Sequence, residues 1–322
     1  MSVTRDDVAR RAGVSTAVVS YVLNGGPRPV SPEKRERVLQ AIAELGYRRD
    51  AVAAALSSRH SYAIGLLVPD AANPYFADLA RRVEDAAFQR GYTVLMGNAA
   101  EDRAREARHL EAFLAHRVDG VVACLADVEA PLPPQLRTFP ERFVLIDRVP
   151  RGWTGRAIAV DNRRGGQLAA ERLIALGRRR LAIVAGPPGF AHVTARVEGF
   201  RERLPGRVTL RIASAARFDF VSGRRTMARL LGDAPPDAVF CCSDALAIGA
   251  LATLAEAGLR VPQDVAVVGY DDVAQAAVTV PPLTTVAQPT DEIANQALEL
   301  LLNPDLPSPG LLAPRLVVRK SA

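Results

Sequence analysis

Residues 8–24 read VARRAGVSTAVVSYVLN, and this stretch decides how the first part of the chain folds. An apolar face for a first short helix is made by Val8, Ala9 and Ala12. Gly13 then supplies the backbone freedom that a tight turn needs. Ser15 suits the N-cap of a second helix, because its hydroxyl accepts a free backbone N–H of the first turn. The pattern predicts a helix-turn-helix, with a plain structural hairpin as the alternative.

The second helix has an apolar side and a polar side. Apolar residues at helical spacing, which we expect to pack against the first helix, are Val18, Val19, Val22 and Leu23. The outer side is left with Thr16, Ala17, Ser20 and Tyr21. In a helix-turn-helix that side enters the major groove of DNA.

The flanking residues extend this small helical unit. Thr4 is placed to cap the first helix, with Asp7 in capping-box position. A third helix is predicted to begin after Ser31, with Pro32 at its first position. Its expected buried stripe is Val38, Leu39, Ile42 and Leu45, and Gly46 is expected to end it.

Residues 50–59, DAVAAALSSR, are helix-prone but too few to form a stable helix alone. A bland linker is one interpretation. The alternative is a hinge that folds only on DNA, where Leu56 wedges between base steps in the minor groove.

Charge is unevenly distributed along the chain. Residues 1–60 hold ten Lys or Arg and six Asp or Glu, a balance of +4, while the remainder holds 31 and 29, a balance of +2. A basic head on a nearly neutral body favours contact with a polyanion through the head. Because 39 of the 41 basic residues are Arg, we attribute the Arg density itself to genome composition.

Length and composition set further bounds. A chain of 322 residues, 49% hydrophobic, predicts two or three domains with a sizeable core. Cys124, Cys241 and Cys242 lie in apolar runs without metal-ligand or CxxC spacing, so we expect reduced, buried thiols and no metal site. No leader or apolar run approaching 18 residues is present, so we expect a cytoplasmic protein without membrane contact.

After residue 62 the pattern changes to apolar strands alternating with amphipathic helices. The strands are predicted at 63–68, 92–96, 120–124, 143–146, 181–185, 238–242 and 265–269. The helices are predicted at 74–90, 103–116, 164–176, 193–204, 221–231 and 244–257. Strands that are apolar on both faces indicate doubly wound parallel sheets, here in two similar α/β lobes with a cleft between strand ends. A last helix at 291–302 and a strand at 315–318 would complete the lobes.

Many motifs in order resemble the lactose-repressor/galactose-repressor family of bacterial transcription regulators. They include DVARRAGVS, VSYVLN, IGLLVPDAANPYFADL, LIDR, SDALAIGAL and PPLTTVAQP, and the resemblance covers essentially the whole chain. The family implies a DNA-binding headpiece (1–49), a hinge (50–60) and an effector-binding core (61–322) like periplasmic sugar-binding proteins. Within the core it implies an N-lobe of about 61–159 and 291–314, and a C-lobe of about 160–290 and 315–322. It also implies a homodimer on a pseudo-palindromic DNA operator.

The resemblance implies roles for headpiece residues. Thr16, Ala17 and Tyr21 would face bases, and Ser20 and Asn24 would lie near phosphates. The remaining DNA-contacting residues expected on this basis are Thr4, Ser15, Val52, Ala53 and Leu56. Two residues depart from the family pattern. Val18 stands where Thr is usual, and Tyr21 replaces a common Arg, so bidentate guanine readout is unavailable at that position.

A polyhydroxylated effector needs carboxylates that accept hydroxyls and an arginine that donates in a fork. The first candidates are Asp147, Arg196 and Asp271, followed by Ser243 and Asp244, with Tyr75, Phe76 and Phe218 as aromatic platforms. Helix capping by the aspartates and core packing by Phe218 are the alternatives. The family usually has Asn at the Ser243 position. The combination favours a sugar or sugar-like ring, and a nucleoside or purine is the alternative ligand.

The sequence therefore predicts a ligand-controlled repressor without a cofactor or catalytic set. Three other classes remain as alternatives. A small-molecule receptor without a DNA role conflicts with the basic head. An enzyme on an α/β scaffold lacks a nucleophile or a paired acid and base. An architectural DNA protein leaves the cleft unexplained.

Overall fold

The computed structural model describes residues 3–24, 29–47, 60–126, 131–150, 152–232 and 235–322, apart from the side chain of Asn24. The chain forms two compact units, Met1–Ser61 and Tyr62–Ala322, which are treated separately below. The expected hinge residues Val52, Ala53 and Leu56 lie outside the described residues.

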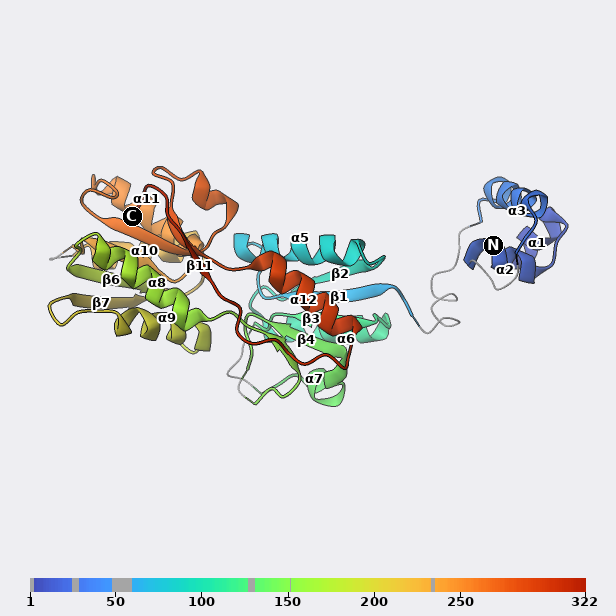
Figure 1. Ribbon diagram of the computed structural model, residues 1–322, viewed down its shortest axis with the longest axis horizontal. Helices are drawn as coiled ribbons and strands as arrows, with labels where there is room; N and C mark the ends of the chain where they lie inside the picture. The colour runs from blue at the N-terminus through green and yellow to red at the C-terminus, as the bar shows by residue number, and fades with distance from the viewer. Residues whose placement is uncertain (1–2, 25–28, 48–59, 127–130, 151, 233–234) are drawn as a thin grey trace. The chain divides into compact units, whose positions relative to one another are not determined.

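The first unit consists of α1 (Arg5–Ala12), α2 (Thr16–Asn24) and α3 (Pro32–Leu45), which confirms the predicted helix-turn-helix and third helix (Figure 1). Thr4 and Asp7 form the predicted capping box, and Gly13 ends α1 with a φ of 63°. The helices enclose a small core made by Val8, Ala9, Ala12, Val19, Val22, Val38 and Ala41.

Two details of α3 differ from the prediction. Leu39 is 49% exposed, so its place in the buried stripe was wrong. The stripe instead runs through Val38, Ala41, Ile42 and Leu45, which follow the helical spacing of three and four residues, whereas Leu39 is turned about 100° from Val38. Ser31 stands at the N-cap but makes no side-chain capping hydrogen bond.

The first lobe of the larger unit is built on a five-stranded parallel sheet with the order β2-β1-β3-β4-β5. Its strands are β1 (Ala63–Val68), β2 (Thr93–Asn98), β3 (Gly120–Ala123), β4 (Phe143–Ile146) and β5 (Arg156–Ile158). Its helices are α5 (Pro74–Phe88), α6 (Arg103–Ala115), α7 (Pro134–Thr138) and the short η1 (Pro140–Arg142).

The second lobe is built on a six-stranded sheet with the order β11-β10-β9-β8-β6-β7, in which only β11 is antiparallel. Its strands are β6 (Arg180–Ala185), β7 (Thr209–Ser214), β8 (Ala238–Cys241), β9 (Ala266–Asp271), β10 (Thr284–Ala287) and β11 (Arg315–Val317). Its helices are α8 (Asn162–Ala175), α9 (Ala191–Glu202), α10 (Phe220–Leu230), α11 (Asp244–Glu256) and the short η2 (Ala274–Ala277).

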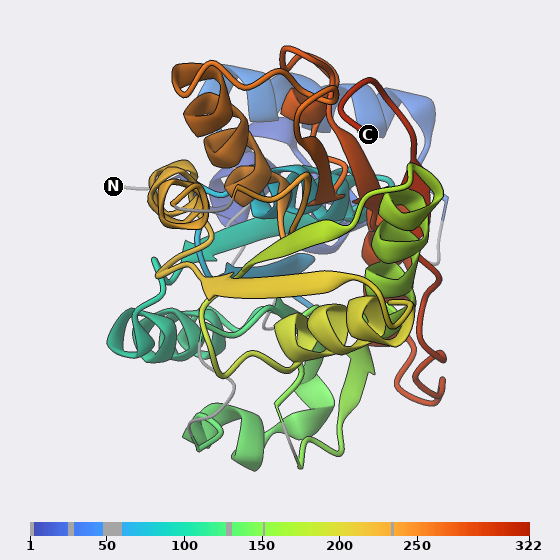
Figure 2. The same ribbon diagram turned by 90° about the vertical axis from the view of Figure 1, so that its left-hand side faces the viewer.

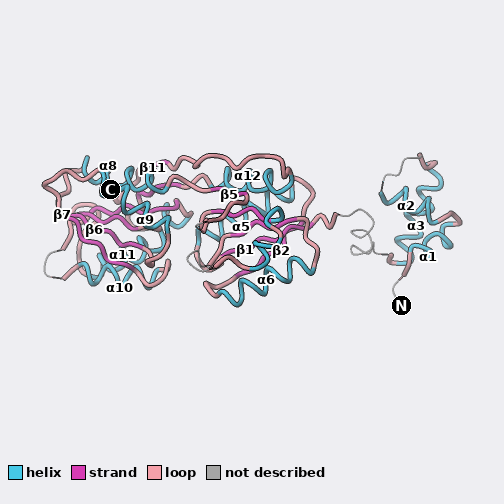
Figure 3. Tube along the Cα trace, turned by 90° about the horizontal axis from the view of Figure 1, so that it is seen from below, coloured by secondary structure: helices cyan, strands magenta, loops and turns pink. Residues whose placement is uncertain are grey.

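Figure 2 shows α8 and α9 on one face of the second sheet and α10 and α11 on the other. Figure 3 shows the strands of each lobe lying between helices. The expected doubly wound α/β architecture is therefore confirmed. The three cysteines are free and buried, as predicted.

The chain passes between the two sheets three times, after β5, after β10 and before β11. The second passage leads to α12 (Thr290–Leu302), which packs on the first lobe beside α5 (Figure 1). Two passages are hydrogen-bonded to each other, since Leu312 N–H donates to Ala159 O at 2.9 Å and Asp161 N–H donates to Leu312 O at 2.8 Å.

The sequence patterns did not predict β5, β7 or β10. β7 is an edge strand whose residues are exposed or half-buried, so it lacks the continuous apolar run of a central strand. β10 is fully buried but begins with Thr284 and Thr285, whose hydroxyls are satisfied by Ala322 O and Asp244. β5 has only three residues.

Glycines allow pairs of helices in the second lobe to touch backbone to backbone. A Cβ on Gly199 of α9 would lie 1.9 Å from Arg163 O, and one on Gly166 of α8 would lie 2.0 Å from Arg196 O. Gly223 and Gly249 hold α10 against α11 in the same way. The α8–α9 contact fixes the position of Arg196, which the next section places in a cavity.

We predict that Gly199→Ala destabilises the protein by about 1–3 kcal/mol, because the added methyl group has to push two helix backbones apart. Gly206→Ala is the matched control, since nothing lies within 4 Å of its Cβ position. Urea unfolding gives both free energies of unfolding. Equal stability of the two variants would contradict the close-packing interpretation.

Candidate functional site

A cavity, which we call the inner cavity, lies between the two lobes. Its walls come from residues at or just after the carboxyl ends of strands in both sheets, where open α/β sheets place their ligands. Seven of the eight predicted effector residues line it: Tyr75, Phe76, Asp147, Arg196, Phe218, Ser243 and Asp271. The other lining residues were not predicted: Asn73, Arg148, His192 and Gln288.

Arg196 of α9 is the most firmly held polar group of the inner cavity. Its Nε donates to Asn162 Oδ1 at 2.7 Å and its Nη1 donates to Cys242 O at 2.7 Å. Its Cζ lies 3.6 Å from the centre of the Tyr270 ring, a cation–π contact. These contacts hold Nε and Nη1 and fix the plane of the guanidinium at the wall of the inner cavity.

Asp147 and Asp271 are both buried at the wall of the inner cavity. Gln288 Nε2 donates to one oxygen of Asp271 at 2.8 Å. Burial raises the pKa of Asp271 to about 7, against the opposing effects of Arg196 and the Gln288 hydrogen bond. Burial also raises the pKa of Asp147, against the positive charges of Arg196 and Arg148.

The backbone at both aspartates is in an uncommon conformation. Asp147 has a φ of 61° and Asp271 has a φ of 118°, in the region that favours glycine. Such residues cluster at functional sites, where the surrounding structure holds them in place. Here they turn two carboxylates toward the inner cavity at the ends of β4 and β9.

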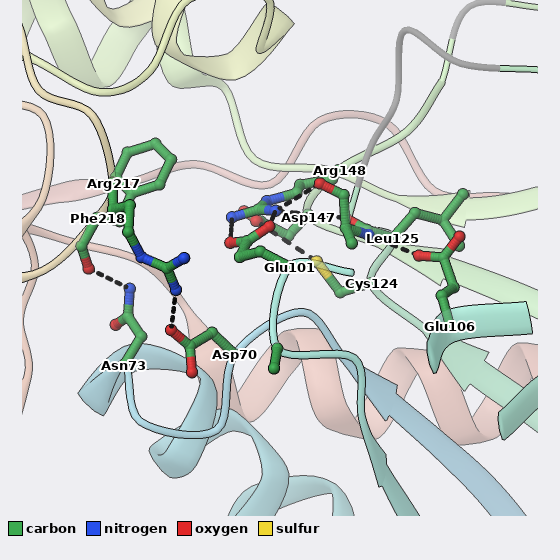
Figure 4. Close-up of polar contacts among 12 residues, drawn as sticks. Asp70, Asn73, Glu101, Glu106, Cys124, Leu125, Asp147, Arg148, Arg217 and Phe218 are labelled. Carbon is green, nitrogen blue, oxygen red and sulfur yellow. Dashed lines mark hydrogen bonds and ion pairs between the residues drawn. The ribbon is translucent and has the colours of Figure 1, made fainter. Parts of the chain in front are cut away.

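Polar contacts also link the two lobes around the inner cavity. Tyr75 OH donates to Gln288 Oε1 at 3.3 Å, and Gln288 in turn holds Asp271, so α5 of the first lobe is linked to β9 of the second. At the start of the same helix, Asn73 Nδ2 donates to Phe218 O at 3.3 Å (Figure 4). The lobe arrangement and the ligand-facing groups are therefore coupled.

Arg148 is the most important residue that sequence reasoning missed. Only 2% of it is exposed, and its guanidinium lies 4.5 Å from the centre of the Phe190 ring and 5.4 Å from that of Phe76. Glu101, 47 residues away, pairs with it through both carboxylate oxygens (Figure 4). The LIDR motif contains Arg148, but nothing in its spacing indicates the partner.

The other missed residues have weaker sequence signals. Asn73 caps α5 by accepting from Tyr75 N–H, so Asn-Pro at a helix start indicates a cap and not a ligand contact. His192 is buried and stacks on Phe218, and burial lowers its pKa well below the usual value, which keeps the ring neutral. Gln288 lies in the PPLTTVAQP motif, where no role was assigned.

Asp244 requires a correction, because it does not line the inner cavity. Its two oxygens accept from Thr285 Oγ1 at 2.6 Å and from Val273 N–H at 2.9 Å, and the side chain is fully buried. It supports the loop after β9 and so acts behind the cavity wall. Ser243 lines the cavity, but its hydroxyl also caps α11 by accepting from Leu246 N–H at 3.2 Å.

In the first unit, the predicted DNA-facing residues share one side of α2. Thr16 and Ala17 are exposed, and Ser20 and Tyr21, one turn further on, are half-buried, while Val19 and Val22 are buried. Thr4 and Ser15 act as caps of α1 and α2. The remaining candidates, the Asn24 side chain and Val52, Ala53 and Leu56, lie outside the described residues.

The described part of the chain contains neither a candidate metal site nor a helix that could span a membrane. Within it, no group of three or more His, Cys, Asp or Glu side chains is arranged to hold a metal ion. No helix there combines the length and apolar character needed to span a membrane.

Comparisons with known proteins agree with the two units. Residues 4–50 match the model of bacterial regulatory proteins of the lacI family, and residues 170–322 match the model of a periplasmic binding protein-like domain. The ribose operon repressor of Escherichia coli (strain K12) is 37% identical, over 99% of this chain and 99% of its own length.

Two solved structures are similar. The Lac repressor dimer bound to operator and the anti-inducer ONPF has a TM-score of 0.85 at 28% identity, covering 100% of this chain and 99% of that chain. A LacI family regulator from Enterococcus faecium with bound ribose has a TM-score of 0.72 at 29% identity, covering 80% and 98%.

The chain belongs to the lacI family of bacterial regulatory proteins. The predicted resemblance is therefore confirmed, and the relative from Escherichia coli carries the name of a repressor, that of the ribose operon.

We predict that Thr285→Val lowers the free energy of unfolding by about 1–3 kcal/mol, because it leaves Oδ1 of the buried Asp244 carboxyl without its hydrogen bond while Oδ2 keeps the bond from Val273 N–H. Thr209→Val is the control, since that residue is exposed. Because Asp244 lies behind the cavity wall, ligand affinity should be nearly unchanged. A selective loss of ligand affinity without loss of stability would assign Asp244 to the binding site.

Proposed function

We propose that this protein is a repressor whose affinity for operator DNA is controlled by a neutral sugar bound in the inner cavity. Residues 1–49 form its DNA-binding headpiece, 50–60 its hinge and 61–322 its effector-binding core. The observation that carries the proposal is that a hydrogen-bond donor and two hydrogen-bond acceptors line the same cavity. The guanidinium of Arg196, held through Nε and Nη1, and the carboxylates of Asp147 and Asp271 line the same space.

The lining of the inner cavity favours a sugar. Carboxylates accept pairs of hydroxyls, an arginine donates to ring or hydroxyl oxygens, and aromatic faces cover the apolar side of a sugar ring. Asp147 and Asp271 face Arg196, and the charge of Arg148 is already balanced by Glu101, so the lining has no excess of positive charge and favours an uncharged ligand over an anion. The relative named for the ribose operon and the neighbour with bound ribose support a pentose of this kind.

A nucleoside or purine is the second candidate ligand. Phe76, Phe190 and Phe218 surround Arg148 at the cavity and would also stack on a flat base. This alternative is tested by including nucleosides and purines in the ligand panel below.

Dimerisation is part of the proposal. β2 is an edge strand that exposes Leu95 and Met96, the latter at 53%, and α5 beside it ends at an exposed Phe88. An apolar edge strand of this kind is normally covered by another chain. The Lac repressor neighbour is a dimer bound to operator, and a dimer here would place two headpieces on a pseudo-palindromic site.

The DNA-reading surface in this proposal is the outer side of α2. Thr16, Ala17 and Tyr21 would contact base edges, and Ser20 would lie near phosphates. Asn24 is proposed for a phosphate contact, and Leu56, flanked by Val52 and Ala53, for a minor-groove wedge. Since a repressor works where the chromosome lies, we propose the cytoplasm as its location, and we propose no catalytic step.

Ligand binding would act on DNA through the arrangement of the lobes. The Tyr75–Gln288–Asp271 chain and the Asn73–Phe218 bond join the lobes beside the inner cavity. A ligand that contacts Asp147 on one lobe and Arg196 on the other favours one lobe arrangement over others. A coupling of roughly 1–3 kcal/mol would change DNA affinity about 5- to 150-fold.

Thermal unfolding of the full chain against sugars, sugar phosphates, nucleosides and purines tests the ligand proposal. A ligand at about 100 times its dissociation constant should stabilise the protein by about 2.7 kcal/mol. We expect the shift from a neutral sugar, with ribose as the first probe. A panel in which no neutral sugar stabilises the protein would contradict the proposal.

We predict that Arg196→Ala abolishes the sugar-dependent thermal shift while DNA binding is retained, because Arg196 lines the inner cavity and the headpiece is a separate unit. Arg201→Ala, an exposed arginine of the same helix, is the matched control and should keep the shift. A normal shift in Arg196→Ala would remove this residue from the binding site.

Ligand binding should also depend on pH, because burial raises the pKa of Asp271 to about 7. Below that pH the protonated carboxyl loses acceptor capacity for sugar hydroxyls, so affinity should rise as pH rises. For a single group with this pKa, the affinity at pH 8 should exceed that at pH 6 by about tenfold. Isothermal calorimetry with ribose measures the profile. An affinity that is constant or falls over this range would show that the ligand does not require ionised Asp271.

A further inference from the structure

The pairing of Arg148 with Glu101 has a consequence for the charge of the ligand. Arg148 lines the inner cavity and its side chain is almost fully buried. A buried arginine in a ligand cavity is the residue type that binds carboxylates and phosphates, through two parallel N–H donors. In this protein those donors are already engaged.

Glu101 occupies both terminal nitrogens of the Arg148 guanidinium. Arg148 Nη1 donates to Glu101 Oε2 at 2.9 Å and Nη2 donates to Oε1 at 3.0 Å, and Nη1 also lies 3.2 Å from Ala126 O (Figure 4). Nε is buried and has no hydrogen-bond partner in the described part of the chain. These contacts leave the Nε–H and one Nη2–H of Arg148 uncommitted, but Nε is fully buried, so the fork that could face a ligand is that of the two terminal nitrogens, and Glu101 occupies it.

The backbone holds Glu101 in this position. Ala100 and Glu101 have φ values of 50° and 58°, an uncommon pair of left-handed residues without glycine. Asn98 Oδ1 accepts from Ala100 N–H at 3.1 Å, and Glu101 N–H donates to Pro69 O at 2.7 Å. The loop between β2 and α6 is thus fixed in a shape that presents this carboxylate to Arg148.

Glu101 also lines a second space, of about 640 Å³, that adjoins the inner cavity at Asn73 and Phe218. A substituent that extends from a ring in the inner cavity enters this space. Its other charged lining residues are Asp70 and Arg217, which pair with each other at 3.4 Å. The described carboxylates that line this space are thus each paired with an arginine, and neither arginine offers an unpaired positive charge to an anionic substituent.

We propose that Glu101 sets the charge selectivity of the ligand site, so that it accepts neutral sugars and rejects their phosphorylated forms. The inference rests on the proposed function, because it takes the inner cavity as the effector site. Glu101 acts through Arg148 and is a positioning residue: it neutralises the guanidinium and keeps its fork from an incoming anion.

The test measures anion binding, which does not require the effector to be known. Isothermal calorimetry of the full chain at low ionic strength, with inorganic phosphate and ribose 5-phosphate as probes, compares the wild type with Glu101→Gln. Low salt is needed because screening weakens charge interactions. We expect Glu101→Gln to bind both probes at least about tenfold more tightly than the wild type, since it frees the Arg148 fork.

Two further variants make the result specific. Glu256→Gln frees Arg224 on the surface in the same chemical way and should gain no phosphate binding. Adding Arg148→Gln to Glu101→Gln should remove the gained binding. A gain that survives in the double variant would place the anion elsewhere and overturn the proposal.

A folded Glu101→Gln protein whose phosphate affinity equals that of the wild type overturns the proposal. If that variant fails to fold, Glu101→Ala takes its place. If both variants fail to fold, calorimetry of the wild type with ribose and with ribose 5-phosphate tests the proposal. Equal affinity for the two ligands would contradict the proposed selectivity. Failure of the proposed function gives a different result, because no neutral sugar would then bind the wild type. The difference in phosphate affinity between the wild type and Glu101→Gln could still be measured and would still test the role of Glu101.

Discussion

Opposite charges buried together between the two lobes are the constraint on which the core of this protein depends. Burying a lone guanidinium or carboxylate is costly, so each must be paired and hydrogen-bonded. Arg148 is paired with Glu101, and Arg196 is held by Asn162, Cys242 O and the Tyr270 ring. Asp147 and Asp271 remain less completely paired, and burial raises the pKa of both. In the proposed function, a bound polyol would supply hydrogen bonds to these two carboxylates.

The rest of the core holds these groups in place. Parallel sheets bring the ends of β4 and β9 to the inner cavity, and backbone contact through Gly166 and Gly199 fixes α9, from which Arg196 projects. The crossing segments between the lobes include Gln288, which contacts both Tyr75 and Asp271. The geometry of the site thus depends on both lobes, and a change in their arrangement changes the site.

Most of the architecture was predictable from sequence, because buried parallel strands and amphipathic helices have strong periodic patterns. Edge strand β7 and the Thr-rich β10 were missed, since their burial depends on neighbours and on hydroxyl partners that lie far away in sequence. Residues at strand ends such as Asp147 and Asp271 were predicted as site candidates. Glu101 was missed because its role comes from a left-handed loop that brings it to a residue 47 positions away. Asp244 was misassigned because proximity in sequence to Ser243 does not show that its carboxylate points to Thr285 and Val273.

The central claim is that occupancy of the inner cavity controls DNA binding by the headpiece. The most direct measurement is the fluorescence anisotropy of a duplex selected by the full-length protein from a random-sequence pool. The duplex is titrated with protein at constant salt, with and without a saturating sugar that stabilises the protein. We expect the dissociation constant for DNA to change by about 5- to 150-fold when the sugar is present. An unchanged dissociation constant at full occupancy of the inner cavity would show that the cavity and the DNA-binding surface are not coupled.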